Sequence, residues 1–299
     1  MTEITGNDRI SEKTFVALGL FDGIHSGHRL ILSQTFLDKE LAPAVFTFRT
    51  ESVRFKHGKP LEYICTNASK LEQMDAMGIK YAYSPDFDDV RELSGEEFVR
   101  DVLCGKMNAG AVVCGENFRF GKNAACGAEE LEAFGKKYGF KVTVVRLSED
   151  AFSSEKYRAM LREGRVDELY CGGNAYILSS QVVHGNRIGR TLDFPTINQH
   201  FAEGQLVPEH GVYHTHTLVG GKVYDSVTNV GVKPTVGENI KPLAETHIIG
   251  FSGDLYGSFV DVEFCRFIRG EKKFASLEEL KKQISADIAC VREQAEICR

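Results

Sequence analysis

Segments with the pattern of strands and segments with the pattern of helices alternate along the first half of this chain. Short apolar runs predict strands at residues 15–20, 44–48, 80–84, 111–114 and 141–146. The stretches between them predict helices at residues 29–39, 69–77, 96–107 and 129–138. This alternation is typical of an α/β domain with a doubly wound parallel sheet, whose ligands bind beyond the carboxyl ends of the strands.

The second half of the chain has a different pattern. After a polar helix expected at residues 153–163, the pattern changes across residues 166–177, which contain the flexible pair Gly172 and Gly173. Beyond them, short runs rich in Val, Tyr and Thr are separated by glycine turns, at residues 181–184, 211–218, 222–230, 246–251 and 259–267. Such runs predict a small antiparallel β-barrel domain.

A C-terminal helix is expected to close the barrel domain. Ser276 fits the N-cap position, and Glu279 fits the capping box three residues later. An apolar stripe at helical spacing would dock this helix, and its members are Leu277, Leu280, Ile284, Ile288 and Val291.

The length of 299 residues is enough for two domains, which we place at residues 1–165 and 178–299. The apolar content is 42%, and no run approaches the ~20 apolar residues needed to span a bilayer. The first ten residues lack the apolar core of a signal peptide. We therefore expect a cytoplasmic protein with no membrane partner.

Charge and cysteine content exclude other classes of protein. The net charge is −6 and the basic residues are dispersed, so a nucleic acid is not an expected partner. The eight cysteines form no CxxC pair and no zinc-like spacing, so they are expected to be small buried side chains. Nothing in the sequence indicates an obligate protein partner.

The ten residues GLFDGIHSGH, 19–28, connect the first expected strand to the first expected helix. A helix N-terminus there offers backbone N–H groups and a favourable dipole to an anion. His25 and His28 are three residues apart and would share one face of the first turn. Two imidazoles can donate hydrogen bonds to phosphate oxygens, while Gly23 and Gly27 let the backbone approach a nucleotide. The segment therefore predicts a phosphate site suited to nucleotidyl transfer.

This motif resembles the HxGH signature of nucleotidylyltransferases. Its GxFDGxHxGH form resembles the bacterial bifunctional riboflavin kinase/FMN adenylyltransferase (FAD synthetase) family. Four further blocks resemble that family's kinase motifs in the family's order, namely GNRIGRTLDFPTIN (185–198), NVGVKPTVGE (229–238), ETHIIGFSGDLYG (245–257) and EFCRFIRGEKKF (263–274). The resemblance implies a nucleotidylyltransferase-type domain before the barrel. It also implies ATP-dependent phosphorylation of riboflavin to FMN, and adenylylation of FMN to FAD with release of pyrophosphate.

In the N-terminal domain, the resemblance implies that His25 and His28 are catalytic and hold the phosphates. It further implies a set of nucleotide-binding residues, namely Gly19, Phe21, Asp22, Gly27, Asn117, Ser154 and Arg158. Asn117 is read equally well as an ordinary turn asparagine.

In the C-terminal domain, the resemblance implies that Gly185, Gly189 and Arg190 contact ATP phosphates. Thr196 and Asn198 match the residues that bind the Mg²⁺–ATP complex, so Mg²⁺ is the expected metal. Glu245 matches the carboxylate that deprotonates or orients the terminal hydroxyl of riboflavin. Arg269 and Glu271 match a loop near the flavin.

Three stretches of the N-terminal domain depart from the family pattern, at residues 47–52, 120–129 and 153–158. In the last of these, Glu155 replaces a threonine, and a carboxylate beside phosphates disfavours the bound anion. We favour the bifunctional enzyme. The alternative is a riboflavin kinase with a degenerate or re-specialised nucleotidylyltransferase domain, and a third reading is a nonenzymatic flavin sensor.

Two other groups of side chains could suggest metal ions. His214 and His216 alternate on an expected strand and so share a face. The sequence shows no third ligand beside them, so a solvated strand face is the favoured interpretation. An acidic cluster, formed by Asp86, Asp88 and Asp89, is expected to lie on a surface loop.

Overall fold

The computed structural model describes residues 1–53, 55–56, 59–146, 152–185, 194–232 and 242–297. The chain divides into two compact units, Met1–Ser154 (unit 1) and Glu155–Arg299 (unit 2). The functional domain bounds expected from the sequence, residues 1–165 and 178–299, stay predictions.

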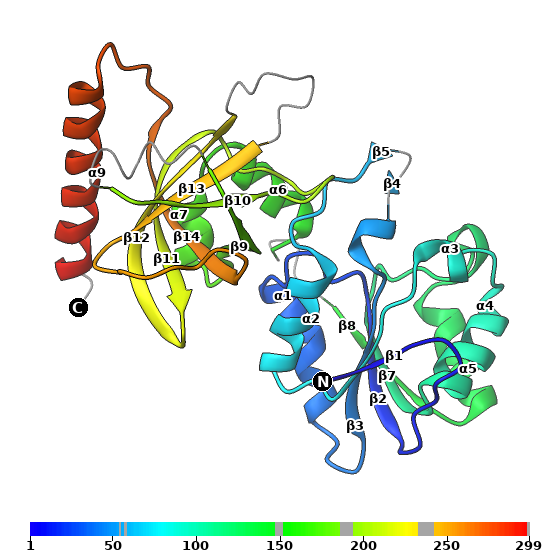
Figure 1. Cartoon of the computed structure of the whole chain (residues 1–299). Coiled ribbons are helices and arrows are strands. Elements are labelled where there is room, and N and C mark those ends of the chain that lie inside the picture. The colour runs from blue at the N-terminus through cyan, green and yellow to red at the C-terminus, as the bar shows by residue number, and fades with distance from the viewer. Residues whose placement is uncertain (54, 57–58, 147–151, 186–193, 233–241, 298–299) are drawn as a thin grey trace. The chain divides into compact units, whose positions relative to one another are not determined.

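Unit 1 is built around a six-stranded parallel sheet, as the sequence predicts (Figure 1). The strands lie in the order β1-β6-β3-β2-β7-β8, and every neighbouring pair is parallel. Their bounds are β1 Thr2–Ile4, β2 Thr14–Leu18, β3 Ala42–Phe46, β6 Tyr81–Tyr83, β7 Ala109–Gly115 and β8 Lys141–Val145. Two short strands, β4 (Phe55–Lys56) and β5 (Lys59–Pro60), form a separate antiparallel pair.

Alternate residues of the central strand β2 face two different layers of helices. Val16 packs in one buried cluster with Leu131 of α5, and Ala17 packs in another with Leu32 of α1. Figure 1 likewise shows α1 and α2 on one face of the sheet and α4 and α5 on the other. The helices are α1 Ser26–Ser33, α2 Asn67–Ala76, α3 Phe87–Val90, α4 Gly95–Glu97, the π-helix η3 Phe98–Lys106 and α5 Ala128–Tyr138, with 3₁₀ turns η1 Gln34–Phe36, η2 Thr50–Ser52 and η4 Lys122–Ala124.

Unit 2 is a closed antiparallel barrel of six strands, which confirms the predicted fold class (Figure 1). The strand order is β10-β13-β12-β11-β14-β9, and β9 pairs back to β10. The strand bounds are β9 Tyr176–Val183, β10 Ile197–His200, β11 Gly211–Val219, β12 Lys222–Val232, β13 Pro242–Ile248 and β14 Phe259–Gly270. The helices are α6 Ser154–Arg162, α7 Val166–Cys171 and α9 Leu277–Ile297.

Helix α9 begins where the sequence predicts, with a shifted capping box. The Ser276 hydroxyl accepts the Glu279 backbone N–H at 3.2 Å, which confirms the N-cap. The Glu279 carboxylate accepts the backbone N–H of Ala275 at 3.0 Å, one residue before the expected partner. Both contacts satisfy backbone donors at the start of the helix.

The apolar stripe of α9 docks on the barrel through its later residues. Ile288 and Val291 are buried in one cluster with Val212 and Val227. Leu277, the first member of the predicted stripe, is 60% exposed and does not pack.

The stretch at residues 166–177, which lies between the two expected domains, contains a helix and the start of a strand, which corrects the expected element bounds. Residues Val166–Cys171 form α7, where Val166 and Leu169 are fully buried. Gly173 adopts φ 69°, which lets the chain turn out of α7, and β9 then begins at Tyr176 instead of residue 181. A second correction concerns the acidic cluster, which is exposed on the short helix α3 and not on a loop.

Candidate active sites

The segment GLFDGIHSGH occupies the turn between β2 and α1, at the carboxyl edge of the parallel sheet. The crossover after β2 leads to β3 on one side and the crossover after β7 leads to β8 on the other, so crossovers from the adjacent strands β2 and β7 run in opposite directions. Such a topological switch point opens a crevice between the loops, where ligands of doubly wound sheets bind. Residues 116–122, which include Asn117, follow β7 at the same edge.

The backbone of this turn adopts uncommon conformations. The φ angle is 53° at Phe21, 80° at Gly23 and 25° at Ile24. Positive φ at a residue other than glycine is strained, and such strain clusters at functional sites. Phe21 and Ile24 are buried, so their packing offsets the strain. The result is a fixed turn that delivers His25 to the N-cap of α1.

His25 and His28 lie on one face of the helix start, as their spacing predicts. Their rings stack with centroids 3.6 Å apart, and His25 Nδ1 accepts the His28 backbone N–H at 3.4 Å. His25 Nε2 lies 3.4 Å from the Ser154 hydroxyl, so the predicted residue Ser154 joins the histidine pair. A Cβ at Gly27 would lie 3.1 Å from the Phe152 carbonyl oxygen and 3.2 Å from the His25 ring, so glycine permits this close approach.

The buried carboxylate of Asp22 ties the histidine turn to residues 64–65. Its Oδ1 accepts the backbone N–H groups of Ile64 at 2.8 Å and Cys65 at 3.2 Å. Burial raises the pKa of the Cys65 thiol to about 12, so that side chain stays neutral beside the carboxylate. These contacts give the predicted turn-shaping role of Asp22 a geometric basis, while a nucleotide contact stays a prediction.

Lys70 of α2 is a buried cation that the sequence analysis missed. Its Nζ donates to the Phe48 carbonyl at 2.6 Å, the Thr47 hydroxyl at 3.1 Å and the Leu20 carbonyl at 3.3 Å. Burial lowers the pKa of Lys70 to about 8. Thr47 also donates to Leu20 at 2.9 Å, so the stretch that departs from the family pattern at residues 47–52 is tied to the histidine turn.

An aromatic cavity of about 300 Å³ opens in unit 1. Its walls come mainly from residues that follow β6 and β7, which end at the same edge of the sheet as β2. Flat apolar walls suit a planar aromatic ligand. The aromatic lining residues are Phe46, Phe48, Phe87, Phe98, Phe118 and Phe120, and Arg119 adds a positive charge.

The other predicted residues of the first site have different positions. Asn117 is exposed in the turn after β7, which fits both of its interpretations. Gly19 follows β2, and a Cβ there would lie 2.9 Å from the Phe21 ring. Arg158 is buried in α6 within unit 2, so its contact with phosphates stays a prediction. Glu155 is exposed.

In unit 2, three polar residues form a row across neighbouring strands. Asn198 of β10 and Asn229 of β12 each lie directly opposite Glu245 of β13. Directly opposed residues of antiparallel strands project from the same face, with Cβ atoms ~5 Å apart. The row therefore brings the predicted base, Glu245, beside the predicted metal ligand Asn198.

Asn198 fits closely against the loop that precedes it. A Cβ at Gly185 would lie 2.5 Å from the Asn198 side-chain nitrogen, so only glycine is accommodated there. The Asn198 Oδ1 atom is buried and has no hydrogen-bond partner among the described residues. A buried acceptor of this kind suits a ligand or a metal ion. The predicted phosphate contacts Gly189 and Arg190 lie outside the described residues.

Thr196 lines two cavities of the barrel unit. The larger, about 360 Å³, is also lined by Glu245, Arg269 and Glu271, so it unites four predicted residues. The smaller, about 250 Å³, lies between Thr196 and the loop at residues 251–256. Thr196 is thus placed to contact ligands in both cavities.

Arg269 is fixed at the wall of the larger cavity by helix α9. Its guanidinium binds both carboxylate oxygens of the buried Asp287, at 3.0 and 2.8 Å. Glu271 is exposed at the same cavity, with its Oε2 3.9 Å from the ring of His210. These interactions do not test the prediction that Arg269 and Glu271 bind a flavin.

Sequence reasoning missed three supporting residues. Lys70 stands between apolar positions of an expected helix, which was an available signal, since a lysine there must find buried acceptors. Asp287 similarly lies next to Ile288 in the apolar stripe. Asn229 opens the block NVGVKPTVGE, but its place beside Glu245 was not predictable, because it depends on strand register.

A turn with paired histidines at the switch point of a doubly wound sheet, and a cavity with threonine and glutamate in an antiparallel barrel, are the arrangement expected of a two-domain transferase. The FAD synthetase family matches residues 7–156, and the riboflavin kinase family matches residues 172–295. The chain belongs to the bifunctional riboflavin kinase/FMN adenylyltransferase family.

Individual relatives agree with this assignment. The bifunctional riboflavin kinase/FMN adenylyltransferase of Bacillus subtilis is 31% identical, over 92% of this chain and 90% of the relative. The Escherichia coli K12 protein of the same name is also 31% identical, over 94% of this chain and 93% of the relative. A Streptococcus pneumoniae crystal structure described as a macrolide-efflux protein has a TM-score of 0.82 and 28% identity, covering 98% of this chain and 99% of that chain. Within the described residues, no helix is both long and apolar enough to cross a membrane.

Proposed function

We propose that unit 2 phosphorylates riboflavin to FMN and that unit 1 adenylylates FMN to FAD, each reaction with ATP. The main observation behind this proposal is that Thr196 and Glu245 line one cavity. The residue that holds ATP and the residue that activates the hydroxyl must face the same reacting atoms. Domain bounds of 1–165 and 178–299 are proposed for the two activities.

In the kinase reaction, Glu245 accepts the proton of the terminal riboflavin hydroxyl as its oxygen attacks the γ-phosphorus of ATP, and ADP leaves. The flavin occupies the larger cavity, where Arg269 and Glu271 contact it and Phe194 and Phe274 add apolar walls. The smaller cavity, beside residues 251–256, takes the nucleotide.

Mg²⁺ is the proposed metal of this site. Thr196 offers a hydroxyl oxygen and Asn198 a buried amide oxygen, and oxygen atoms of this kind are the ligands that Mg²⁺ prefers. When bound with ATP, the ion neutralises charge that develops on the phosphates. Glu245, opposite Asn198 on the adjacent strand, would lie close to the residues that hold the ion.

In the adenylyltransferase reaction, a phosphate oxygen of FMN attacks the α-phosphorus of ATP and pyrophosphate leaves. His25 accepts the His28 backbone N–H at Nδ1, so a neutral His25 ring carries its proton at Nε2. That proton and the His28 ring can stabilise charge on the phosphates, together with the N-terminus of α1. The aromatic cavity in the same unit is proposed to hold the isoalloxazine ring.

The experiment is to incubate the purified chain with ATP and Mg²⁺, once with riboflavin and once with FMN, and to separate FMN from FAD. We expect FMN and then FAD from riboflavin, FAD from FMN, and neither product when EDTA replaces Mg²⁺. FMN without FAD in both incubations would support the riboflavin kinase with a degenerate nucleotidylyltransferase domain. No product at all would support the nonenzymatic flavin sensor.

The stacked histidine pair favours the active adenylyltransferase, because its geometry is intact despite the three altered stretches. A cytoplasmic location stays a prediction from the sequence. So does the absence of membrane, nucleic-acid and obligate protein partners.

A further inference from the structure

The outer face of the barrel carries a cluster of metal-binding side chains that the flavin reactions do not use. It comprises His214 and His216 of β11, Asp225 of β12, and Glu263 and Cys265 of β14. The sequence-based interpretation of a solvated strand face is wrong here, since His214 is only 8% exposed. The strand pairing supplies what the sequence could not, because His216 lies directly opposite both Asp225 and Glu263.

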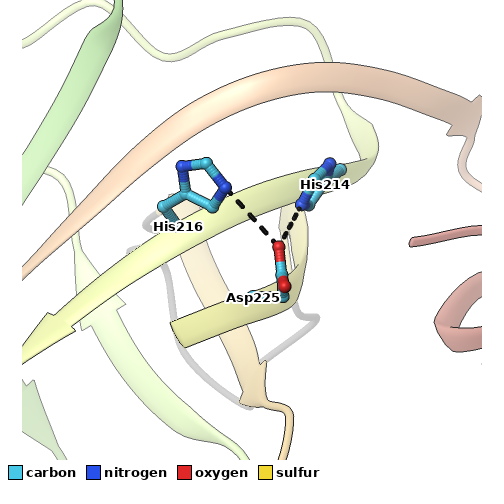
Figure 2. A group of neighbouring side chains, drawn as sticks. All are labelled: His214, His216 and Asp225. Atoms are coloured by element: carbon cyan, nitrogen blue, oxygen red, sulfur yellow. Dashed lines mark hydrogen bonds and ion pairs between the residues drawn. The ribbon is translucent and has the colours of Figure 1, made fainter. Parts of the chain in front are cut away.

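Both histidines point at one carboxylate oxygen (Figure 2). His214 Nε2 is 3.0 Å and His216 Nε2 is 3.5 Å from Asp225 Oδ1, and the three ligand atoms lie within 4.8 Å of one another. For bonds of ~2.05 Å, two ligands on a tetrahedral ion are about 3.3 Å apart. Two of the three distances between ligand atoms, 3.0 and 3.5 Å, lie on either side of that value. The side chains therefore need to move little to bind an ion.

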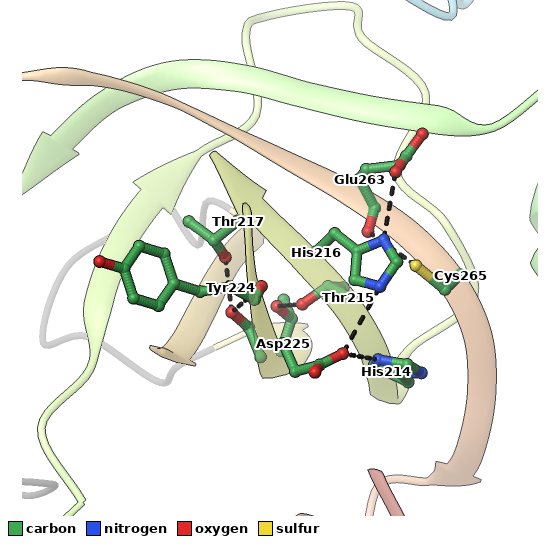
Figure 3. A network of polar contacts seen from close by, with 10 residues as sticks. His214, Thr215, His216, Thr217, Tyr224, Asp225, Glu263 and Cys265 are labelled. Atoms are coloured by element: carbon green, nitrogen blue, oxygen red, sulfur yellow. Dashed lines mark hydrogen bonds and ion pairs between the residues drawn. The ribbon is translucent and has the colours of Figure 1, made fainter. Parts of the chain in front are cut away.

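The remaining nitrogen of His216 has the partner that a metal-bound histidine needs. His216 Nδ1 lies 3.4 Å from Glu263 Oε2 (Figure 3). A histidine that binds a metal through one nitrogen commonly donates its other N–H to a carboxylate, which fixes the tautomer and the ring orientation. With its proton on Nδ1, toward Glu263, His216 would present the lone pair of Nε2 to an ion held beside Asp225.

Charge and access also suit a cation. Asp225 and Glu263 supply two negative charges, and the nearby Arg266 is exposed, so its charge is screened by solvent. The side chains of His216 and Asp225 are 26% and 28% exposed, which admits an ion and leaves room for water as a further ligand. On the opposite face of β11, Thr215 bonds to another hydroxyl inside the barrel, so the strand between the histidines is fixed (Figure 3).

We propose that His214, His216 and Asp225 bind a divalent transition-metal ion, for which Zn²⁺ is the best match. Two imidazoles and a carboxylate favour Zn²⁺ over Mg²⁺, which prefers oxygen ligands. The ion links β11 to β12 outside the flavin and nucleotide cavities, so this site does not depend on the proposed function. Bound there, it stabilises the barrel.

The test uses the full chain, stripped with a chelator, desalted and titrated with ZnCl₂ by calorimetry. Wild type is expected to take up one Zn²⁺ through this site, with a rise in Tm. Asp225→Asn and His216→Gln are each expected to weaken this binding by at least about 100-fold. Glu263→Gln, which removes only the orienting carboxylate, is expected to weaken it about 10- to 100-fold.

His200→Gln is the matched control, because His200 is an exposed histidine on β10 of the same barrel. It should bind Zn²⁺ like wild type, and circular dichroism shows whether every variant is folded. Absence of zinc binding by wild type would overturn the proposal. So would unchanged binding by folded Asp225→Asn and His216→Gln, which would place the ion elsewhere.

Co²⁺ distinguishes the neighbouring set formed by His216, Glu263 and Cys265. The proposed site holds no thiolate, so the Co²⁺ form should show visible d–d bands without a sulfur-to-metal charge-transfer band, and Cys265→Ser should not change them. A charge-transfer band that disappears in Cys265→Ser would contradict the proposed ligand set.

Discussion

At the residue scale, the first active site depends on how closely two imidazole rings approach a helix N-terminus. His25 is buried against Phe152 and Gly27, and it accepts a backbone hydrogen bond, whereas His28 on the same face is less buried. The spacing of the two histidines was sufficient to predict that they share a face. Their stacking and the contact with Ser154 were not predictable, because Ser154 comes from a segment far along the chain.

Replacing His28 by Ala tests its role as a phosphate donor. We expect the rate of FAD formation from FMN to fall by about 100-fold or more, as for loss of other charge-stabilising donors. Riboflavin phosphorylation should be nearly unchanged, and Tm should fall little, since His28 is not fully buried. A packing role would instead give a lower Tm with FAD synthesis preserved, and normal FAD synthesis would contradict the account of this site.

Lys70→Met tests the buried cation beside the same turn. The pKa of Lys70 is lowered to about 8 in the folded chain, so between pH 8 and its unfolded value of 10.5 the unfolded state binds more protons. The free energy of unfolding therefore gains a contribution that rises with pH across this window, at up to about 1.4 kcal/mol per pH unit.

The measurement is urea denaturation of wild type and Lys70→Met at pH values from 7.5 to about 10.5, which cover the range where Lys70 loses its proton. The variant removes the N–H donors that the oxygen atoms of Leu20, Thr47 and Phe48 contact in wild type, so it should be less stable at every pH. The gap between the two proteins should widen as pH rises. A constant gap would show that Lys70 does not titrate in this window.

At the scale of secondary structure, long periodic segments were predictable and register-dependent features were not. The strands of both sheets and the docking of α9 follow from apolar pattern. The short strands β1 and β10 were missed, because three or four residues carry too little pattern. Helix α7 was not predicted, because its six residues carry too little helical pattern. Asp225 and Asn229 became candidates only once cross-strand partners were known.

The ion pair between Arg269 and Asp287 links β14 to α9 and allows a prediction for these elements. Asp287 is buried, so Asp287→Asn leaves an uncompensated guanidinium and should destabilise unit 2 by about 3 kcal/mol. Because Arg269 lines the cavity that we propose for the flavin, KM for riboflavin should also rise.

Urea denaturation and riboflavin phosphorylation kinetics measure both effects. Asp261→Asn on the same strand, which is only partly exposed and outside the cavity, is the control and should change neither quantity much. An Asp287→Asn variant with unchanged stability would contradict a structural role for the pair.

At the scale of the whole molecule, the division into two units predicts that the kinase activity can be separated. Unit 2 begins at Glu155, and α7 packs its buried residues Val166 and Leu169 against the barrel. A chain of residues 155–299 should therefore fold and phosphorylate riboflavin. A chain of residues 178–299 lacks this cover and should have a Tm lower by several degrees.

Thermal unfolding and FMN formation by the two truncated chains are the measurements. If residues 178–299 are as stable and active as residues 155–299, helices α6 and α7 are dispensable for the kinase. A folded but inactive chain of residues 155–299 would contradict the assignment of the kinase to unit 2.

The most direct test of the two-site account is Glu245→Gln, assayed with riboflavin and separately with FMN. Glu245 lies beside Asn198 and Thr196 in the barrel unit, far in sequence from the histidine turn of unit 1. We predict that FMN formation from riboflavin falls by at least about 100-fold, as for loss of a general base, while FAD formation from supplied FMN is unchanged. The control, Glu278→Gln on the exposed start of α9, should leave both rates unchanged. Loss of both activities in folded Glu245→Gln, or retention of riboflavin phosphorylation, would contradict the account.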